Sequence, residues 1–377
     1  MPAAIGIDTL AGFSTDPLPP GMRPTTPIKS TAVTCPRILA VVGLALLTAC
    51  GSPPTAVPGP AAQLPAPAAA TVTPGAGVKV GIALGGGAAK GFAHIGVIKM
   101  LEANGFAPAV VAGTSAGSVV GALYASGMNA FELQQKAVAL DETSIRDLQL
   151  SSGGLVLGQK LEDYVNEQVR RQPLEKLAKP FVAVATRLED GERTMFSRGN
   201  TGQAVRASSS VPGVFQPVAI GRFHFVDGGV VSPVPVYAAR QLGADIVVAV
   251  DISSKARGQA PAGMLGTLGQ SIAIMGQKLG QAELARADVV VRPQVLDIGA
   301  ADFTQRASAI LEGERAALAV MPQIRERVAQ LQAAREQATR LAQQKTAEAQ
   351  RLACLEQRSR LQKLAGMAGI DSACPAP

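Results

Sequence analysis

The sequence predicts an α/β domain with a largely parallel central sheet over residues 78–320, followed by a long C-terminal helix. Short apolar runs that end in glycines alternate with stretches of helical spacing, which is the pattern of a parallel sheet covered by helices. Hydrophobic residues make up 47% of the 377 residues, and aromatic residues only 3%, with no Trp. The length suits one large domain or two ordinary ones, with a core built from Ala, Val, Leu and Ile.

A short apolar run near the N-terminus predicts an export signal. Ile38–Leu47 follows Lys29 and Arg37 and, at about ten residues, is too short to span a bilayer as a helix. The run leads into Leu-Thr-Ala-Cys, ending at Cys50, which resembles the bacterial lipoprotein signal. The alternative is an ordinary buried helix, which would be unusual directly before a structureless Pro/Ala tract.

This resemblance implies that residues 1–49 form a lipoprotein signal peptide and that Cys50 carries the lipid. The protein would then be anchored in the bacterial cell envelope, at the outer membrane or a periplasm-facing membrane. Residues 1–21 lack the short basic start of such signals, so Met22 is a candidate for the true initiator. Residues 50–77 are rich in Pro and Ala without charge, which is typical of an extended, solvated tether.

The first elements of the folded part can be read in order. Val78–Leu84 is a buried strand candidate that runs into a Gly/Ala loop, and helical spacing follows over Phe92–Asn104. Ala109–Ala112 is a second buried strand, and a helix over Ser118–Ser126 follows its glycine-containing turn. Further strands are expected at Phe181–Thr186, Arg193–Ser197, Arg222–Val226, Ile246–Val250 and Val289–Val291, and further helices at Leu161–Arg170, Val234–Leu242 and Leu265–Ala285.

The C-terminal part differs in composition from the predicted domain. Residues 305–363 are rich in Ala, Gln, Arg and Glu, which predicts a long, mostly solvated helix, with residues 321–377 as a basic tail. Its positive charge is either an ordinary solvated face or an attraction to anionic lipid headgroups. Basic residues without interleaved aromatics make nucleic acid a poor candidate partner. Cys354 and Cys374 either pair with each other or stay free.

The glycine loop after the first strand runs from Gly85 to Gly91. It does not fit a dinucleotide-binding loop, because Lys90 stands where G-x-G-x-x-G needs glycine and no acid closes the second strand. A P-loop is excluded because Gly91, and not Ser or Thr, follows the lysine. The loop still offers successive backbone N–H groups at a helix N-terminus, which stabilise an anion. The alternative is a purely structural tight turn.

Gly113-Thr114-Ser115-Ala116-Gly117 fits G-x-S-x-G between a strand and a helix. Flanking glycines permit the sharp turn that exposes a nucleophilic hydroxyl, and such a serine needs a base. The chain has only two histidines. His94 lies early in a predicted helix, where a structural role is expected.

The second histidine, His224, lies three residues before Asp227 on a predicted strand. An offset of three places the two side chains on opposite faces, so a Ser-His-Asp triad is disfavoured. Asp227 is followed by Gly228 and Gly229, which let the chain turn and other groups come close. In a desolvated cleft the pKa of this carboxyl would rise, making it a better base. The alternative is a turn-forming Asp-Gly pair.

Together the glycine loop, Gly-Thr-Ser-Ala-Gly and Asp-Gly-Gly, in this order at strand ends, resemble the patatin-like phospholipase family. The segments Gly91–Val97 and Arg206–Phe215 look similar too, and the resemblance covers about residues 78–320. It implies a three-layer α/β sandwich and a serine acyl hydrolase with a Ser–Asp dyad and no metal or cofactor. The implied roles are nucleophile Ser115, base Asp227, oxyanion-hole amides of Gly85, Gly86, Gly87 and Ala88, and motif-supporting glycines Gly113, Gly117, Gly228 and Gly229.

The sequence therefore predicts a lipid acyl hydrolase of phospholipase A, lysophospholipase or esterase type, acting through an acyl-enzyme. Membrane lipids or other acyl esters are the expected substrates. Ser144–Leu161 is a candidate lipid-contacting lid. The alternative is a non-catalytic envelope lipoprotein that binds an unknown protein partner through its C-terminal helix.

Overall fold

The computed structural model describes residues 77–141, 147–151, 154–254 and 263–365. The predicted signal peptide, Cys50 and the tether up to residue 76 lie outside the described residues, as does Cys374. Their assignments stay predictions from sequence.

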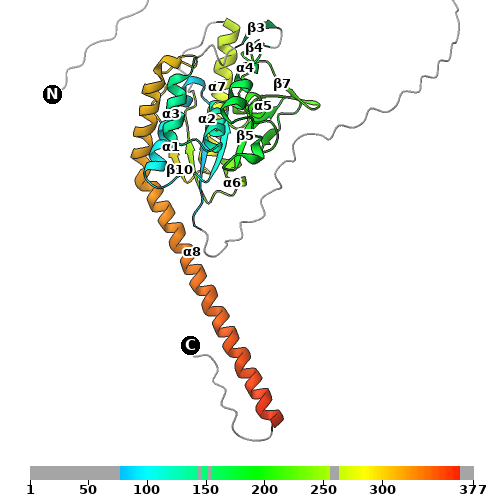
Figure 1. The fold of residues 1–377 in the computed structure, drawn as a ribbon, viewed down its shortest axis with the longest axis vertical. Coiled ribbons are helices and arrows are strands. Elements are labelled where there is room, and N and C mark those ends of the chain that lie inside the picture. The colour runs from blue at the N-terminus through cyan, green and yellow to red at the C-terminus, as the bar shows by residue number, and fades with distance from the viewer. Residues whose placement is uncertain (1–76, 142–146, 152–153, 255–262, 366–377) are drawn as a thin grey trace, which may run out of the picture. The chain divides into compact units, whose positions relative to one another are not determined.

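The domain is built on an eight-stranded, largely parallel sheet (Figure 1). Five strands are parallel, in the order β10-β9-β1-β2-β5, and β6, β8 and β7 add antiparallel pairs at the β5 end. A separate hairpin, β3–β4, lies within the segment expected as a lid. The strands are β1 Val80–Leu84, β2 Val110–Thr114, β3 Leu148–Ser151, β4 Gly154–Val156, β5 Phe181–Arg187, β6 Arg193–Phe196, β7 Val218–Ile220, β8 Phe223–Asp227, β9 Ile246–Val250 and β10 Val289–Val291.

Helices cover both faces of the sheet, which confirms the predicted fold class. Alternate residues of β1 enter different cores: Ile82 and Leu84 pack on one face and Ala83 on the other. Strands buried on both sides have to be apolar throughout, as these are. The helices on the first face are α1 Ala93–Ala103, α2 Ala116–Ala125, α3 Ala130–Ala139, α4 Gln159–Gln168, α5 Thr201–Ser208 and the start of α8 Arg306–Ala365. The second face is covered by α6 Val236–Gln241 and the end of α7 Gly263–Leu284.

Glycines allow α1 and α8 to pack in direct backbone contact. A Cβ on Gly96 of α1 would lie 2.0 Å from the carbonyl oxygen of Ile310 in α8. A Cβ on Gly313 of α8 would likewise lie 2.0 Å from the carbonyl oxygen of Ala93. The first turns of α8 are therefore part of the domain core.

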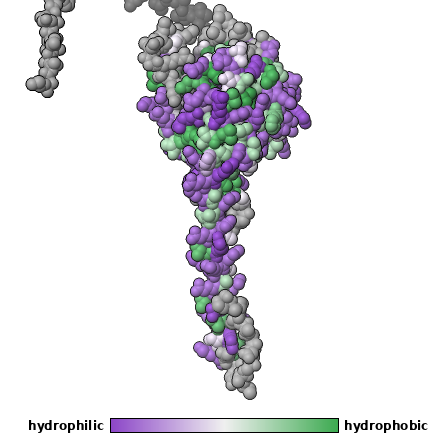
Figure 2. Space-filling model, turned by 90° about the vertical axis from the view of Figure 1, so that its left-hand side faces the viewer, coloured by the Kyte–Doolittle hydropathy of each residue, from purple (hydrophilic) through white to green (hydrophobic). Residues whose placement is uncertain are grey.

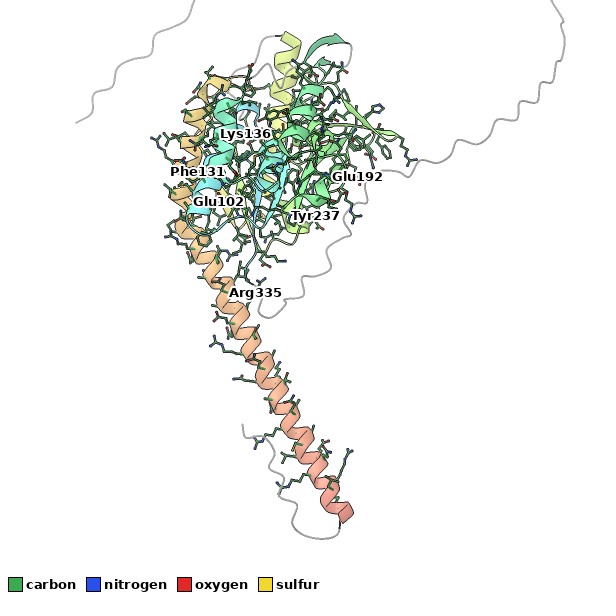
Figure 3. The ribbon with its side chains drawn as sticks, viewed as in Figure 1. Glu102, Phe131, Lys136, Glu192, Tyr237 and Arg335 are labelled. Carbon is green, nitrogen blue, oxygen red and sulfur yellow. The ribbon has the colours of Figure 1, made fainter. Side chains whose placement is uncertain are left out.

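The packing of α8 continues past residue 320. Met321 and Ile324 are buried, and Arg335 binds Asp245 just before β9 (Figure 3). Beyond residue 340 nearly all described side chains are exposed, and Figure 2 shows isolated hydrophobic residues among hydrophilic ones there. No helix among the described residues is both long enough and apolar enough to cross a membrane.

We expect Gly313→Ala to destabilise the domain, because the added methyl group meets backbone that cannot rotate away. The free energy of unfolding should fall by about 2–4 kcal/mol in urea denaturation. Gly269→Ala in α7 is the matched control, since a Cβ there meets nothing within 4 Å. That change should be neutral or stabilise by up to about 1 kcal/mol. Equal stability of the two variants would contradict the close α1–α8 contact.

Candidate active site

Ser115 stands at the turn between β2 and α2. Its backbone has φ 54° and ψ −125°, a conformation that strains any residue with a Cβ. Such strain is typical of a serine held at a sharp strand-to-helix turn. Ser115 is only 8% exposed, so it sits in a largely desolvated position.

The glycines on either side of Ser115 permit this turn. A Cβ on Gly113 would lie 2.4 Å from the carbonyl oxygen of Gly117. A Cβ on Gly117 would lie 2.1 Å from the carbonyl oxygen of Leu84, at the end of β1. Glycine at both positions therefore lets the start of α2 press against the ends of β1 and β2.

Asp227 reaches Ser115 because β2 and β8 share one edge of β5. β2 pairs with β5 as far as Thr114 opposite Val184, and β8 pairs with the next residue, with Asp227 opposite Ala185. The other edge of β5 is occupied by β6. The two strands run in opposite directions along the shared edge, so their C-terminal ends meet head to head.

The Asp227 carboxylate is held in a buried position. Its Oδ1 accepts a hydrogen bond from the Gly229 N–H at 2.6 Å. Burial raises the pKa of Asp227 to about 6, although the Ser115 hydroxyl and the Gly229 N–H both lower it. Oδ2 is buried and completes no hydrogen bond of standard geometry among the described residues. Asp227 thus faces the Ser115 hydroxyl with a carboxylate that burial makes easier to protonate.

The turn after Asp227 also depends on glycine. A Cβ on Gly228 would lie 2.1 Å from the carbonyl oxygen of Val184, so only glycine lets this turn lie directly on β5. Gly229 supplies the N–H that orients the carboxylate. Each glycine of the Asp-Gly-Gly motif therefore has its own structural role.

Two of the four predicted oxyanion-hole amides are engaged elsewhere. The Gly85 N–H donates to the carbonyl oxygen of Val250 at 3.1 Å, and the Gly86 N–H to that of Pro233 at 3.0 Å. Gly86 still lies against the serine, since a Cβ on it would be 3.2 Å from the Ser115 Cβ. These two residues shape the loop, and their N–H groups serve the fold.

The remaining donors are Gly87 and Ala88, whose N–H groups have no acceptor among the described residues. Ala88 has a positive φ of 52°, which is strained for a residue with a side chain. Ala116, the first residue of α2 and the residue directly after Ser115, carries a third N–H that has no acceptor among the described residues. The sequence analysis missed Ala116, although its place directly after the serine is a recognisable signal.

Both histidines lie away from the dyad. His94 is fully buried, with Nε2 at 2.8 Å from the carbonyl oxygen of Gly85, and burial lowers its pKa to about 4. It is therefore neutral and donates to the glycine loop. The exposed His224 pairs with Glu189 at 2.9 Å. Within the described ranges, no group of three or more His, Cys, Asp or Glu is placed to hold a metal ion.

Ser208, at the end of α5, is a supporting residue whose role the sequence analysis did not identify. Its Oγ accepts from the Ser115 N–H at 3.0 Å and donates to the carbonyl oxygen of Val184 at 2.6 Å. Nearby, the carbonyl oxygen of Ser210 accepts from the Asp227 N–H at 2.8 Å. The Ser-Ser-Ser run that follows Ala207 was the available signal, but only the fold shows what it contacts.

Comparison with known proteins finds similarity over the part of the chain that contains Ser115 and Asp227. Residues 82–240 match the family model of the patatin-like phospholipases. The chain is 36% identical over 185 residues to an uncharacterized NTE family protein of Mycobacterium tuberculosis, covering 48% of this chain and 51% of that protein. It is 32% identical over 187 residues to human patatin-like phospholipase domain-containing protein 6, covering 48% of this chain and 14% of that protein.

A further match is the lysophospholipase NTE1 of Pyricularia oryzae, 32% identical over 184 residues that make up 47% of this chain and 12% of that protein. The chain thus spans about half the length of the mycobacterial relative and far less of the others. Among solved structures, VipD of Legionella pneumophila aligns with TM-score 0.46 and 15% identity, over 66% of this chain and 67% of that one. The family model and these relatives therefore show that residues 82–240 are similar to the patatin-like phospholipases.

Proposed function

We propose that this protein is a lipid acyl hydrolase in which Ser115 is the nucleophile and Asp227 the general base. The observation that carries the proposal is the meeting of a strained, desolvated serine with a buried carboxylate whose pKa is raised to about 6. Neither histidine contacts this pair among the described residues, so the carboxylate itself would take the proton.

The reaction would proceed in two halves. Ser115 Oγ attacks the ester carbonyl carbon while Asp227 accepts the hydroxyl proton, and the N–H groups of Gly87, Ala88 and Ala116 stabilise the oxyanion. The tetrahedral intermediate collapses, and the leaving alcohol takes the proton from Asp227. Water then attacks the acyl-enzyme while its proton passes to Asp227. As the second tetrahedral intermediate collapses, Asp227 returns that proton to Ser115 Oγ, and the free acid is released.

The substrate class follows from the family and the named relatives. One relative is a lysophospholipase and another a patatin-like phospholipase domain-containing protein. We therefore propose phospholipid or lysophospholipid esters as substrates, of phospholipase A, lysophospholipase or esterase type. Lipid attachment at Cys50 would hold the enzyme in the cell envelope, and this part of the proposal rests on the sequence of residues 38–50 alone.

Ser115→Ala should lower kcat/KM for a short-chain ester such as p-nitrophenyl butyrate by about 10³-fold or more, because the nucleophile is removed. A fluorophosphonate probe should label the wild type and not this variant. Ser126→Ala, at the far end of α2, is the matched control and should keep both properties. If Ser115→Ala retained full activity and labelling, the non-catalytic lipoprotein alternative would replace the hydrolase.

The pH profile should report the ionisation of Asp227. Since the base must be deprotonated, log kcat/KM should rise with pH and level off above about pH 6. Asp227→Asn should lower kcat/KM by about 10²–10⁴-fold and abolish this inflection. Histidine side chains in general have pKa values close to the pH of this inflection, so a histidine could be its source. His224→Gln is therefore the control and should leave the inflection in place. Loss of the inflection in His224→Gln would contradict the assignment.

Asp227→Asn should increase the stability of the fold at high pH while it lowers the activity. The folded pKa of Asp227, about 6, lies above its ordinary value of 3.8, so ionisation of the buried group destabilises the fold increasingly as pH rises from about 4 to above 6. Asp227→Asn should therefore raise the free energy of unfolding at pH 8 by about 1–3 kcal/mol. A destabilised, inactive variant would indicate that Asp227 is chiefly structural.

Lipid attachment can be tested separately from catalysis. Cells fed labelled palmitate should incorporate it into the wild-type protein and not into Cys50→Ser, because the thiol is the attachment point. Cys354→Ser is the control and should keep the label. Equal labelling of the wild type and Cys50→Ser, or no label in either, would remove the anchor from the proposal.

A further inference from the structure

Helix α7 carries an exposed apolar stripe. Leu268, Met275 and Leu279 are spaced by seven and four residues and so lie on one side of the helix. They are 43%, 50% and 39% exposed. We call these three side chains the α7 stripe.

A different side of α7 packs on the catalytic turn. A Cβ on Gly276 would lie 3.8 Å from the carbonyl oxygen of Gly229, and a Cβ on Gly280 would lie 3.4 Å from Pro233 Cγ. The helix thus lies within ordinary van der Waals reach of the segment that follows Asp227. The stripe is therefore carried by an element in direct contact with the candidate active site.

Buried Glu283 anchors the C-terminal end of α7 to the same segment. It accepts hydrogen bonds from Ser232 Oγ at 2.6 Å and from the Val234 N–H at 3.2 Å, and Arg193 lies 3.7 Å away. The guanidinium of Arg193 in turn lies over the ring of Tyr237, 5.1 Å from its centroid. The helix is held at a defined position beside the site.

The α7 stripe lies next to another exposed apolar residue, Val214. Leu268 Cδ2 would lie 3.5 Å from a Cβ on Gly213, and the next residue, Val214, is 44% exposed. This segment follows Ser210, whose carbonyl oxygen accepts the Asp227 N–H. Figure 1 shows α7 at the same end of the domain as the β3–β4 hairpin, and β4 is bonded to Val214.

The charges of α7 suit an anionic lipid surface. Between Gly263 and Leu284 the charged residues are Lys278 and Glu283. Lys278 is exposed, whereas Glu283 is buried and bonded, so α7 offers lipid headgroups a cation and no exposed carboxylate. Apolar side chains flanked by a lysine are typical of helices that lie in the membrane interface.

We propose that the α7 stripe docks on an anionic lipid surface and presents the Ser115–Asp227 site to acyl esters in that surface. The inference rests on the proposed function for its substrate, but docking itself requires no catalysis. Docking would bring the turn at Gly229 to the membrane, so that an acyl ester can leave the bilayer without crossing water.

A single introduced tryptophan tests the docking, because the chain has none. The full chain carries Cys50→Ser throughout, so that no lipid at that residue contributes. Emission of Met275→Trp should shift to the blue when vesicles of ether-linked phosphatidylglycerol are added, since these lipids have no ester to cleave. Val138→Trp on α3, where Val138 is 63% exposed, is the matched control and should not shift.

The outcomes separate docking from its alternatives. A blue shift in Met275→Trp alone supports the proposal. No shift in that variant, or a shift only in Val138→Trp, overturns it. A blue-shifted emission that depends on protein concentration without vesicles, with a dimer in solution, would assign the stripe to a second copy of this chain and also overturn it.

A second experiment links docking to catalysis. In the triple variant Leu268→Gln/Met275→Gln/Leu279→Gln, the ratio of vesicle-phospholipid hydrolysis to soluble-ester hydrolysis should fall about tenfold or more. Phe131→Gln/Val138→Gln is the control, because these α3 side chains are 66% and 63% exposed and should leave the ratio unchanged. An unchanged ratio in the triple variant overturns the proposal.

The two experiments also separate this inference from the proposed function. If the wild type hydrolyses neither substrate but Met275→Trp still shifts with vesicles, the hydrolase proposal fails and the docking surface stands. If hydrolysis depends on Ser115 but neither the emission nor the ratio responds, the docking surface fails and the hydrolase stands.

Discussion

The shared edge of β5 is the constraint on which the candidate site depends. β2 runs parallel to β5 and β8 runs antiparallel to it along the same edge. Their pairings with β5 end at consecutive residues, Val184 for β2 and Ala185 for β8. Ser115 follows one strand end and Asp227 closes the other, so two residues far apart in sequence become neighbours. Ser208 ties Ser115 to the carbonyl of Val184, and Thr186 bonds the carbonyl of Asp227. The closeness of Ser115 and Asp227 thus follows from strand register.

Close contacts between backbone segments at glycines recur in the structure. Gly117 meets the end of β1, Gly228 meets β5 and Gly96 meets α8, each where a Cβ would lie 2.0–2.1 Å from a carbonyl oxygen. Such contacts fit a chain with few aromatic residues, because small residues let layers approach that large side chains would hold apart.

Burial acts in opposite directions on the two buried titratable groups near the glycine loop. It lowers the pKa of His94 to about 4, which keeps the imidazole neutral and donating to Gly85, and raises that of Asp227 to about 6, which makes the carboxylate a stronger base. One group therefore holds the loop while the other can accept a proton. The α7 stripe is carried by the helix that packs against the turn after Asp227.

The sequence by itself determined the layered α/β class, the central strands and the glycine turns that carry Ser115 and Asp227, because doubly buried strands are apolar throughout and the glycine turns at their ends are local. It did not reveal α3, although Asn129 and Glu132 form a capping box at its start, nor α5. Only the tertiary structure decided which amides remain for an oxyanion, since Val250 and Pro233 occupy those of Gly85 and Gly86. It also decided that Ser208 supports the serine and that the long helix is anchored in the core. Hydrogen-bond partners and helix packing arise from segments distant in the chain, so no local pattern encodes them.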